Sequence, residues 1–408
     1  MSPEKEKNMD DRHQVDRRTF FKTAGLGAFG LMALGPDRRA EASSELPPEI
    51  HGALEDGVLK RTLGRTGLKV TAIGLGTIPT FRAPQAQAVE VIRKSIDLGI
   101  NFIDTARAYR KGYSEDRIGV ALNGIRQKVV IASKTRQFEK GEGALQDVET
   151  SLKTMNTDYV DIYCFHELCQ EKEWEQVIAP KGALEGLKRA KKDGKIRFIG
   201  ISGHRSGQLT KIVESGEIDV VIIPYNYVFD DADADLWPAC AKLNVGMVAI
   251  KPFAGGFLNQ HSLSLRWNLQ KPPHVTVPGM WQVDEVTQNT RHLREFLPVT
   301  ETELAYLHEE RQYWYYQLCR FCYQCQPCPQ GIDYRTIVMM PLMLRRQGFE
   351  IVLVEGDNKL KYLNEMDKID KCTNCQTCIN TCPYHLPITD LIKDVKRTYY
   401  SPVKYYRI

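Results

Sequence analysis

Eight short apolar runs that alternate with helix-like segments between residues 58 and 298 predict an α/β fold, a (β/α)8 barrel of the TIM type. Each run is nearly continuous in apolar and β-branched residues, as expected of a parallel strand that is buried on both faces. The length of this region fits the ~250 residues typical of such barrels. After Pro298 the pattern changes to helical segments and two groups of cysteines. We therefore predict a second, mostly helical domain over residues 299–408.

The predicted strands, in order, are TAIGLGT (71–77), NFIDTA (101–106), VVIASKT (129–135), VDIYCFH (160–166), IRFIGIS (196–202), VVIIPYN (220–226), GMVAIKP (246–252) and HVTVPGM (274–280). Helical patterns such as GALQDVETSLKTM and GALEGLKRAKKDG separate them, and the latter ends in Gly, which commonly stops a helix. A doubly wound open sheet is the alternative arrangement of the same elements. The first strand–helix unit contains no G-x-G-x-x-G motif, and this favours the barrel.

The first 42 residues have the features of an export signal. Arg17 and Arg18 in DRRTFFKTAG precede an uncharged run, and Ala40 and Ala42 have the spacing of a small-residue cleavage site. The uncharged run is too short for a membrane span, which needs ~20 apolar residues. We predict a twin-arginine signal peptide over residues 1–42, recognised by the export translocase for folded proteins. The protein would be periplasmic or exported, and membrane-associated if the signal is not cleaved; the alternative is a basic N-terminus that stays in the cytoplasm.

The stretch that follows the signal, SSELPPEIHGALEDG (43–57), contains Pro-Pro and no periodicity, and it predicts a linker. The whole chain carries 55 Lys and Arg and 51 Asp and Glu, with a formal net charge of +4. These charges are interleaved, so the chain lacks the basic patch of a nucleic-acid-binding protein. We expect no nucleic acid among its partners.

The cysteines of the second domain form two groups, CRFCYQCQPCP and CTNCQTCINTCP. Three thiolates at two-residue gaps can bind one iron-sulfur cluster, and in two-cluster ferredoxins the cysteine before proline binds the neighbouring cluster. This crossed pattern predicts two [4Fe-4S] clusters in a ferredoxin-like domain. One cluster would be bound by Cys319, Cys322, Cys325 and Cys382, and the other by Cys372, Cys375, Cys378 and Cys328.

Two four-cysteine zinc sites are the alternative for these groups. Zinc sites usually pair two distant C-x2-C segments, whereas both groups here end in Cys-Pro, which favours iron-sulfur clusters. The remaining cysteines, Cys164, Cys169 and Cys240, are predicted to be inert core residues.

Polar residues stand at the ends of three consecutive predicted strands. They are Asp104, Lys134 and His166, and Tyr109 follows Asp104 on the next loop. In such barrels the chemistry lies at the C-terminal ends of the strands, and neighbouring strands lie roughly 5 Å apart. We therefore expect these four side chains to share one pocket. A phenol with a pKa near 10 needs a neighbouring cation to act near neutral pH.

The segments NFIDTARAY, ASKT, FH and PGM resemble the aldo-keto reductases over residues 58–297, and IKPFAGG together with the cysteine domain is similar to a ferredoxin-linked branch of that family. The resemblance implies an oxidoreductase that interconverts a small carbonyl substrate and an alcohol with NADP or NAD. It implies that Tyr109 is the general acid and that Lys134 lowers the pKa of this tyrosine. Asp104 would hold Lys134, and His166 would orient the carbonyl.

Two departures from the family pattern affect these assignments. The segment YRKGYSE has two residues more than usual after the tyrosine, so Tyr113 competes with Tyr109, although the spacing from Asp104 favours Tyr109. The nucleotide-binding positions match only in part: the contacts that the resemblance implies are Ser202, Lys251, Gly279, Gln288 and Asn289. The positions that differ from the family are Gly203, Ile222, Ile250, Trp281 and Gln282. His204 is predicted to lie on the surface.

The leading hypothesis is an exported iron-sulfur oxidoreductase whose barrel interconverts a carbonyl and an alcohol. Its electrons would be exchanged through the two clusters with a redox partner protein at the membrane or in the periplasm. Because such clusters are assembled in the cytoplasm, they would explain export after folding. The alternative is a non-catalytic barrel scaffold in a periplasmic ferredoxin-type electron carrier.

Overall fold

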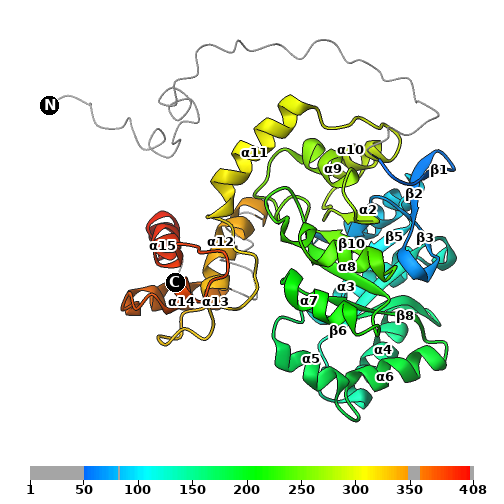
Figure 1. Ribbon diagram of the computed structural model, residues 1–408, viewed down its shortest axis with the longest axis horizontal. Coiled ribbons are helices and arrows are strands. Elements are labelled where there is room, and N and C mark those ends of the chain that lie inside the picture. Colours follow the sequence, from blue (N-terminus) through cyan, green and yellow to red (C-terminus); the bar gives the residue numbers. More distant parts are fainter. Residues whose placement is uncertain (1–49, 81–82, 348–358, 405–408) are drawn as a thin grey trace. The chain divides into compact units, whose positions relative to one another are not determined.

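The computed structural model describes residues 50–80, 83–347 and 359–404 (Figure 1), all of which belong to one compact unit, Ser43–Ile408. The predicted signal peptide and the first part of the predicted linker lie outside the described residues. Among the residues described, no helix is both long and apolar enough to cross a membrane.

Eight parallel strands form the barrel, and neighbours in the sheet are also neighbours in the sequence. They are β4 (Leu75–Gly76), β5 (Phe102–Asp104), β6 (Val130–Thr135), β7 (Val160–Phe165), β8 (Ile196–Ser202), β9 (Val220–Pro224), β10 (Gly246–Ile250) and β11 (Val275–Val277). Parallel bridges from Ile73 to Thr276 and from Gly76 to Gly279 join the first and last strands, so the sheet is closed. Each strand lies within one of the eight predicted runs, and the predicted (β/α)8 barrel is confirmed.

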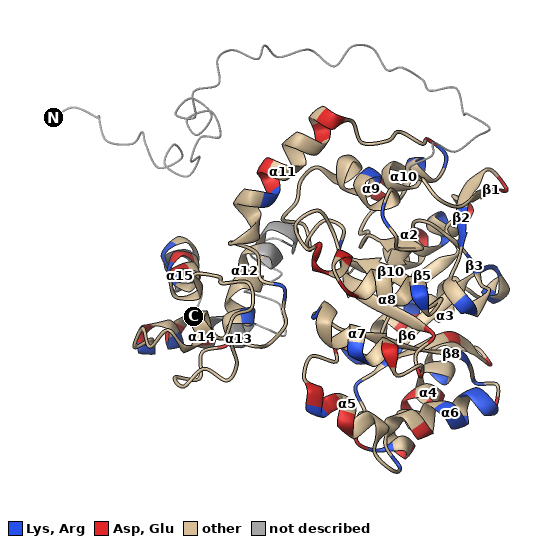
Figure 2. Cartoon of the chain, viewed as in Figure 1, with Lys and Arg blue, Asp and Glu red and all other residues tan. Residues whose placement is uncertain are grey.

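Helices cover the outside of this barrel (Figure 1). They are α2 (Gln85–Asp97), α3 (Tyr113–Ala121), α4 (Gly141–Met155), α5 (Glu171–Ile178), α6 (Ala183–Lys192), α7 (Ser206–Glu214), α8 (Leu236–Lys242), α9 (His261–Leu269) and α10 (Val283–Thr290). Residues of both charges interleave on α4, α5 and α6 (Figure 2). The strands fill the interior with side chains such as Phe102, Ile162 and Val248. Because helices cover the other face, each strand is buried on both sides and reads as a continuous apolar run.

A three-stranded antiparallel sheet precedes the barrel. It consists of β1 (Ala53–Glu55), β2 (Val58–Thr62) and β3 (Lys69–Thr71). The linker predicted over residues 43–57 therefore ends earlier than expected. The reason is a two-residue turn, Asp56-Gly57, in which both residues have positive φ, the conformation that closes a tight hairpin. Val70 packs into the barrel interior against side chains of the strands.

The C-terminal part is mostly helical, as predicted, with α11 (Glu301–Tyr315), α12 (Tyr334–Gln347), α13 (Lys359–Lys368), α14 (Thr377–Asn380) and α15 (Ile388–Lys404). α11 begins with a capping box in which Thr300 and Glu303 bind each other's backbone N–H groups. Salt bridges from Arg266 to Glu303 and from Arg311 to Asp230 connect α11 to the barrel. Arg320 donates to the backbone oxygens of Tyr315, Leu318 and Val228 at 2.6 to 3.3 Å.

Candidate active site and cysteine centre

The four polar residues predicted to share a pocket come together at the C-terminal ends of β5, β6 and β7. Lys134 Nζ donates to Asp104 Oδ1 at 2.6 Å and to the Thr105 backbone oxygen at 2.5 Å. Only 1% of the Lys134 surface is exposed. Its Nζ lies 5.3 Å from the centre of the Tyr109 ring. Asp104 therefore holds a buried cation beside the tyrosine, in the arrangement that the sequence predicts.

His166 completes this group. Its ring centre lies 5.6 Å from that of Tyr109, with 77° between the ring planes. The side chain is buried, and its Nδ1 has no hydrogen-bond partner among the described residues. Burial and the charge of Lys134 hold the pKa of His166 well below its usual value. The imidazole is therefore neutral near pH 7 and can donate one hydrogen bond to a ligand.

Two opposing effects act on the pKa of Tyr109. Burial raises it, and the positive charge of Lys134 lowers it, as predicted. Burial outweighs the cation, so the pKa of Tyr109 lies above its usual value and the phenol is protonated near neutral pH. Burial lowers the pKa of Lys134, but Asp104 and Tyr109 raise it more, so the lysine remains charged.

The two residues that lengthen the segment after Tyr109 are Arg110 and Lys111. Both have left-handed backbone conformations, with φ of 48° and 54°, and Gly112 follows with φ of 95°. This loop takes up the insertion, so that α3 begins at Tyr113. The Tyr113 side chain is 49% exposed, whereas Tyr109 lines the pocket. The structure thus places Tyr109, and not Tyr113, beside Lys134.

Two cavities meet at this site. The larger, of about 250 Å³, is lined by Asp104, by the ends of β4 and β10, and by Gly279. The smaller, of about 180 Å³, is lined by Lys134, His166 and Ser202. The residues that line both cavities are Ile78, Tyr109, Glu167, Ile250 and Lys251. Asp104, Tyr109, Lys134 and His166, together called the tetrad, therefore face one continuous opening at the barrel mouth.

The cysteine domain contributes one wall of the larger cavity through Phe321, Arg335 and Met339. None of these residues was predicted. Phe321 stands between two cysteines in the sequence, and neither Arg335 nor Met339 belongs to a motif. Their place in the site depends on how the second domain packs against the barrel, which no local pattern encodes.

The predicted nucleotide contacts divide into two groups. Ser202, Lys251 and Gly279 line the cavities, whereas Gln288 and Asn289 lie on α10 and line neither. The Ser202 hydroxyl accepts a hydrogen bond from Glu167 N at 3.0 Å. At Gly203, one of the positions that differ from the family, a side-chain Cβ would lie 2.8 Å from the Leu168 backbone oxygen. A larger residue is therefore excluded at Gly203 unless the backbone shifts.

The start of α10 also departs from the family pattern. The Glu285 carboxylate accepts hydrogen bonds from the backbone N–H groups of Trp281 and Gln282. It thereby occupies donors that an anion at this helix N-terminus would use. Trp281 and Gln282, two of the positions that differ from the family, thus have a negative charge beside their backbone N–H groups.

His204 is not on the surface, and this prediction was wrong. Only 6% of its surface is exposed, because the cysteine domain covers this part of the barrel mouth. Its Nε2 lies 3.2 Å from Lys251 Nζ, and its ring centre lies 6.5 Å from that of Phe321. His204 is therefore part of the wall that the two domains share.

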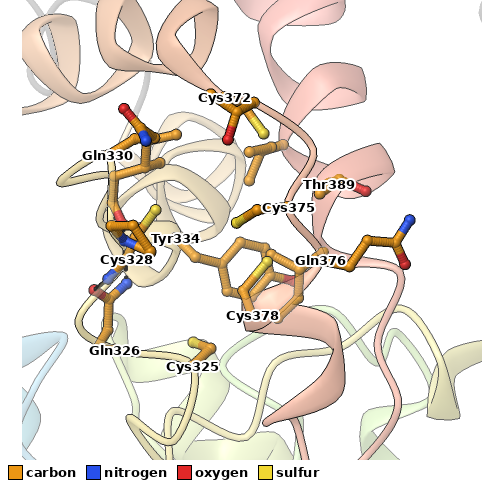
Figure 3. A pocket seen from close by; sticks show the side chains of 15 residues that line it. Cys325, Gln326, Cys328, Gln330, Tyr334, Cys372, Cys375, Gln376, Cys378 and Thr389 are labelled. Carbon is orange, nitrogen blue, oxygen red and sulfur yellow. Dashed lines mark hydrogen bonds between the residues drawn. The ribbon is translucent and has the colours of Figure 1, made fainter.

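The eight cysteines of the second domain have free thiols. Burial raises the pKa of Cys319 to about 12, and the nearby thiols of Cys325, Cys322 and Cys382 add to this rise. Burial also raises the pKa of Cys378, whose neighbouring thiols are Cys328 and Cys372. In Figure 3, Cys328, Cys372, Cys375 and Cys378 point toward a common space. Cys325 lines the same space, so the two groups of cysteines lie close together, and crossed ligation remains a prediction.

Tyr334 lies near thiols of both predicted sets. Its hydroxyl is buried and has no hydrogen-bond partner among the described residues, and its charge neighbours include Cys319, Cys325, Cys382 and Cys378. An unsatisfied buried hydroxyl costs about 1–3 kcal/mol. Cluster sulfur would accept its hydrogen bond, so the donor set and Tyr334 fit iron-sulfur clusters. Within the described ranges no three His, Cys, Asp or Glu side chains are close enough to hold a single metal ion.

The three cysteines of the barrel have the environment predicted for core residues. Cys164, Cys169 and Cys240 are buried, and burial raises the pKa of each thiol to about 12. A thiol with such a pKa is a poor nucleophile and metal ligand at neutral pH.

Comparisons with known proteins match both parts of the chain. The aldo/keto reductase family model matches residues 72–263, and a 4Fe-4S dicluster domain model matches residues 318–387. L-galactose dehydrogenase of Arabidopsis thaliana is 32% identical over 216 residues, which are 49% of this chain and 67% of that protein. An uncharacterized oxidoreductase of Bacillus subtilis is 27% identical over 262 residues, which are 61% of this chain and 82% of that protein.

A solved structure shows the same similarity. It is an aldo-keto reductase from Klebsiella pneumoniae in complex with NADPH, with 25% sequence identity and a TM-score of 0.53. The match covers 62% of this chain and 95% of that chain. The aldo/keto reductase match thus lies in the barrel region, and the 4Fe-4S match lies in the cysteine domain.

Proposed function

The chain belongs to the aldo/keto reductase family and carries a C-terminal 4Fe-4S dicluster domain, and from this premise we propose that it couples carbonyl–alcohol interconversion in the barrel to electron exchange through two [4Fe-4S] clusters. One residue carries the proposal. Phe321 lies between Cys319 and Cys322, and its backbone N–H donates to Cys319 Sγ at 3.2 Å. Its ring lines the same cavity as Asp104 and Tyr109. A loop that binds a cluster thus also forms the wall of the barrel site.

In the reducing direction, Tyr109 would donate its proton to the carbonyl oxygen. Lys134 would stabilise the phenolate that remains, and Asp104 keeps that lysine charged and in place. The neutral imidazole of His166 would donate a hydrogen bond that orients the carbonyl. In the oxidising direction the phenolate would take the proton back from the alcohol. A nicotinamide nucleotide, when bound, supplies or accepts the hydride.

The barrel mouth fits such a nucleotide in part. Ser202, Lys251 and Gly279 would face it, and the similar Klebsiella pneumoniae structure holds NADPH. In contrast, Gly203 provides no side chain for the nicotinamide amide, and the Glu285 carboxylate disfavours a 2'-phosphate. These departures favour the second candidate function, a non-catalytic barrel in a ferredoxin-type electron carrier.

Mass spectrometry of small molecules released by denaturing the anaerobically purified protein tests the nucleotide. About one NADP or NAD per chain would support the carbonyl–alcohol function, with the altered contacts governing retention. Iron and sulfide without any nucleotide would overturn nicotinamide chemistry, and the barrel would then be a scaffold or hold another cofactor.

The clusters, when bound, supply single electrons. The set that contains Cys319 would lie nearest the barrel, since Phe321 follows this cysteine in the cavity wall. In the other set Cys375 is exposed, whereas Cys322 and Cys382 of the first set are buried. We infer that the redox partner protein docks at the exposed set, at the membrane or in the periplasm.

The role of Phe321 predicts the effect of its removal. In Phe321→Ala, oxidation of the reduced clusters by substrate should slow by about 10- to 100-fold, the range expected when a positioned contact is lost. Stopped-flow absorbance of the clusters measures this rate, while iron content and the electron paramagnetic resonance spectrum should be unchanged. Tyr316→Ala is the control, because this aromatic residue precedes the same loop and is exposed. An unchanged rate in an intact Phe321→Ala protein would contradict the proposal.

Export through the twin-arginine route is supported by residues 1–42 of the sequence. Residues 1–45 fused to a folded fluorescent reporter should direct it to the periplasm, and replacing Arg17 and Arg18 by lysine should retain it in the cytoplasm. Cell fractionation measures both fusions. A reporter that stays cytoplasmic with the natural arginines would favour the alternative of a cytoplasmic enzyme.

A further inference from the structure

Two cations of the larger cavity have no salt-bridge partner in the part of the chain that the structure describes. They are Lys251, at the end of β10, and Arg335, in the first turn of α12. Lys251 Nζ lies 3.2 Å from His204 Nε2 and 4.8 Å from the centre of the Phe321 ring. The Arg335 guanidinium lies 4.3 Å from the centre of the Tyr323 ring.

The acidic groups of the site are already used by other cations. Asp104 pairs with Lys134, and Glu167 pairs with Arg136. Lys251 and Arg335 therefore leave the cavity walls with an excess of positive charge. Burial lowers the pKa of Lys251; Glu167 raises it, Arg335 lowers it and Cys319 raises it, in decreasing order of effect. Two half-buried cations on one cavity are unfavourable without an anion between them.

The buried imidazole of His204, beside Lys251, also has a polar atom without a partner among the described residues. His204 lines the smaller cavity together with Lys251, and its Nδ1 has no hydrogen-bond partner among the described residues. The cations around it are Lys251, Arg335 and Arg136, and with burial they hold the pKa of His204 well below its usual value. The neutral ring thus has an N–H to donate.

The backbone holds Lys251 in this position. Lys251 has a left-handed conformation with φ of 57°, which is unfavourable for a lysine. Its carbonyl oxygen accepts hydrogen bonds from Asn226 Nδ2 at 3.0 Å and from Ala254 N at 2.9 Å. Such strain, maintained by surrounding hydrogen bonds, is typical of residues that contact a ligand.

We propose that Lys251 of the barrel and Arg335 of the cysteine domain together bind an anionic group, a phosphate or a carboxylate, of the molecule that occupies the barrel mouth. Arg335 can bind such a group through two parallel N–H donors, and Lys251 acts as a point charge. The group belongs either to the phosphates of a nucleotide or to an acidic carbonyl substrate. The proposal rests on the proposed function for the location of the ligand, and it does not depend on electron transfer.

Isothermal titration calorimetry of the full-length protein with its clusters tests this site. The probes are pyrophosphate, NADP⁺ and pyruvate, at low salt. Lys251→Met and Arg335→Met should each weaken binding by about 10- to 100-fold, the effect of losing one charge-assisted hydrogen bond. Lys188→Met and Arg397→Met remove exposed charges elsewhere and should leave binding unchanged. Lys251→Arg keeps the charge and should retain most of the affinity, even if a neutral variant folds poorly.

The probes distinguish the two sources of the anion. If pyrophosphate and NADP⁺ bind and both variants weaken them, the anion is a nucleotide phosphate. If pyruvate binds and both variants weaken it, the anion is a substrate carboxylate. Either result supports the site, whereas equal affinities in all proteins, or no binding of any probe, would overturn it. The titration measures binding and involves no turnover. The anion site can therefore be supported or overturned whatever the result of the Phe321→Ala experiment.

Discussion

Tyr109→Phe should lower the turnover number for carbonyl reduction by about 10²- to 10⁴-fold, the range for loss of a positioned general acid. Phenylalanine keeps the ring against His166 and Lys134 and removes only the hydroxyl. The clusters should be unaffected, because Tyr109 lies on the barrel loop after β5. Steady-state kinetics with a small aldehyde and NADPH measure the effect, with iron content and the visible spectrum as checks on the clusters.

The matched control is Tyr113→Phe. This tyrosine is four residues further along the chain, at the start of α3, and is half exposed, so the variant should keep full turnover. Electron transfer from the reduced clusters to an acceptor dye should be unchanged in both variants. If Tyr109→Phe also retained full turnover, the tetrad would have no catalytic role, and the electron-carrier function would be favoured.

The pH dependence of the wild-type enzyme tests the same assignment. The acid form of Tyr109 is lost only as the pH rises through a pKa that burial has raised. The neutral form of His166 is lost only as the pH falls through a pKa that burial has lowered. Turnover in the reducing direction should therefore vary little between about pH 6 and pH 9, provided that proton donation limits the rate. A steep fall between pH 7 and pH 9 would show that a group with a lower pKa donates the proton.

The second large effect concerns iron content. Substituting one cysteine should remove one whole cluster, and the cysteines that share a cluster come from both sequence groups. Cys322→Ser, Cys382→Ser and the double variant should each retain about four of eight iron atoms, because both cysteines would bind the same cluster. The double variant Cys322→Ser with Cys328→Ser should lose both clusters, although these cysteines belong to one group in the sequence. Iron and acid-labile sulfide analysis measures the content, and electron paramagnetic resonance identifies the remaining cluster.

Uncrossed ligation predicts the reverse result for the double variants. The Cys322 and Cys328 pair would then keep about four iron atoms, and the Cys322 and Cys382 pair would lose all eight. Cys240→Ser is the control, since this buried thiol lies on α8 of the barrel and should leave the iron content unchanged. The neighbours of Cys319 and Cys378 in the structure favour the crossed result.

The sequence by itself determined the barrel, the tetrad and the two cysteine groups. Strands buried on both faces must be continuously apolar, so each run is recognisable from a few neighbouring residues. Once the topology is a parallel barrel, consecutive strand ends are adjacent, and Asp104, Lys134 and His166 must lie close together. The cysteine spacing is likewise local, because short loops direct successive thiolates to one cluster.

Only the tertiary structure decided how the second domain completes the site. The burial of His204, the wall formed by Phe321 and the position of Arg335 beside Lys251 each depend on contacts between segments far apart in the chain. The clash that a side chain at Gly203 would make with the Leu168 backbone likewise depends on a contact between two separate segments. Such contacts arise from the packing of complete elements, and residue types and spacing contain no signal for them. The grouping of Asp104, Tyr109, Lys134 and His166 could therefore be predicted from the sequence, whereas the wall that the second domain adds to their cavity could not.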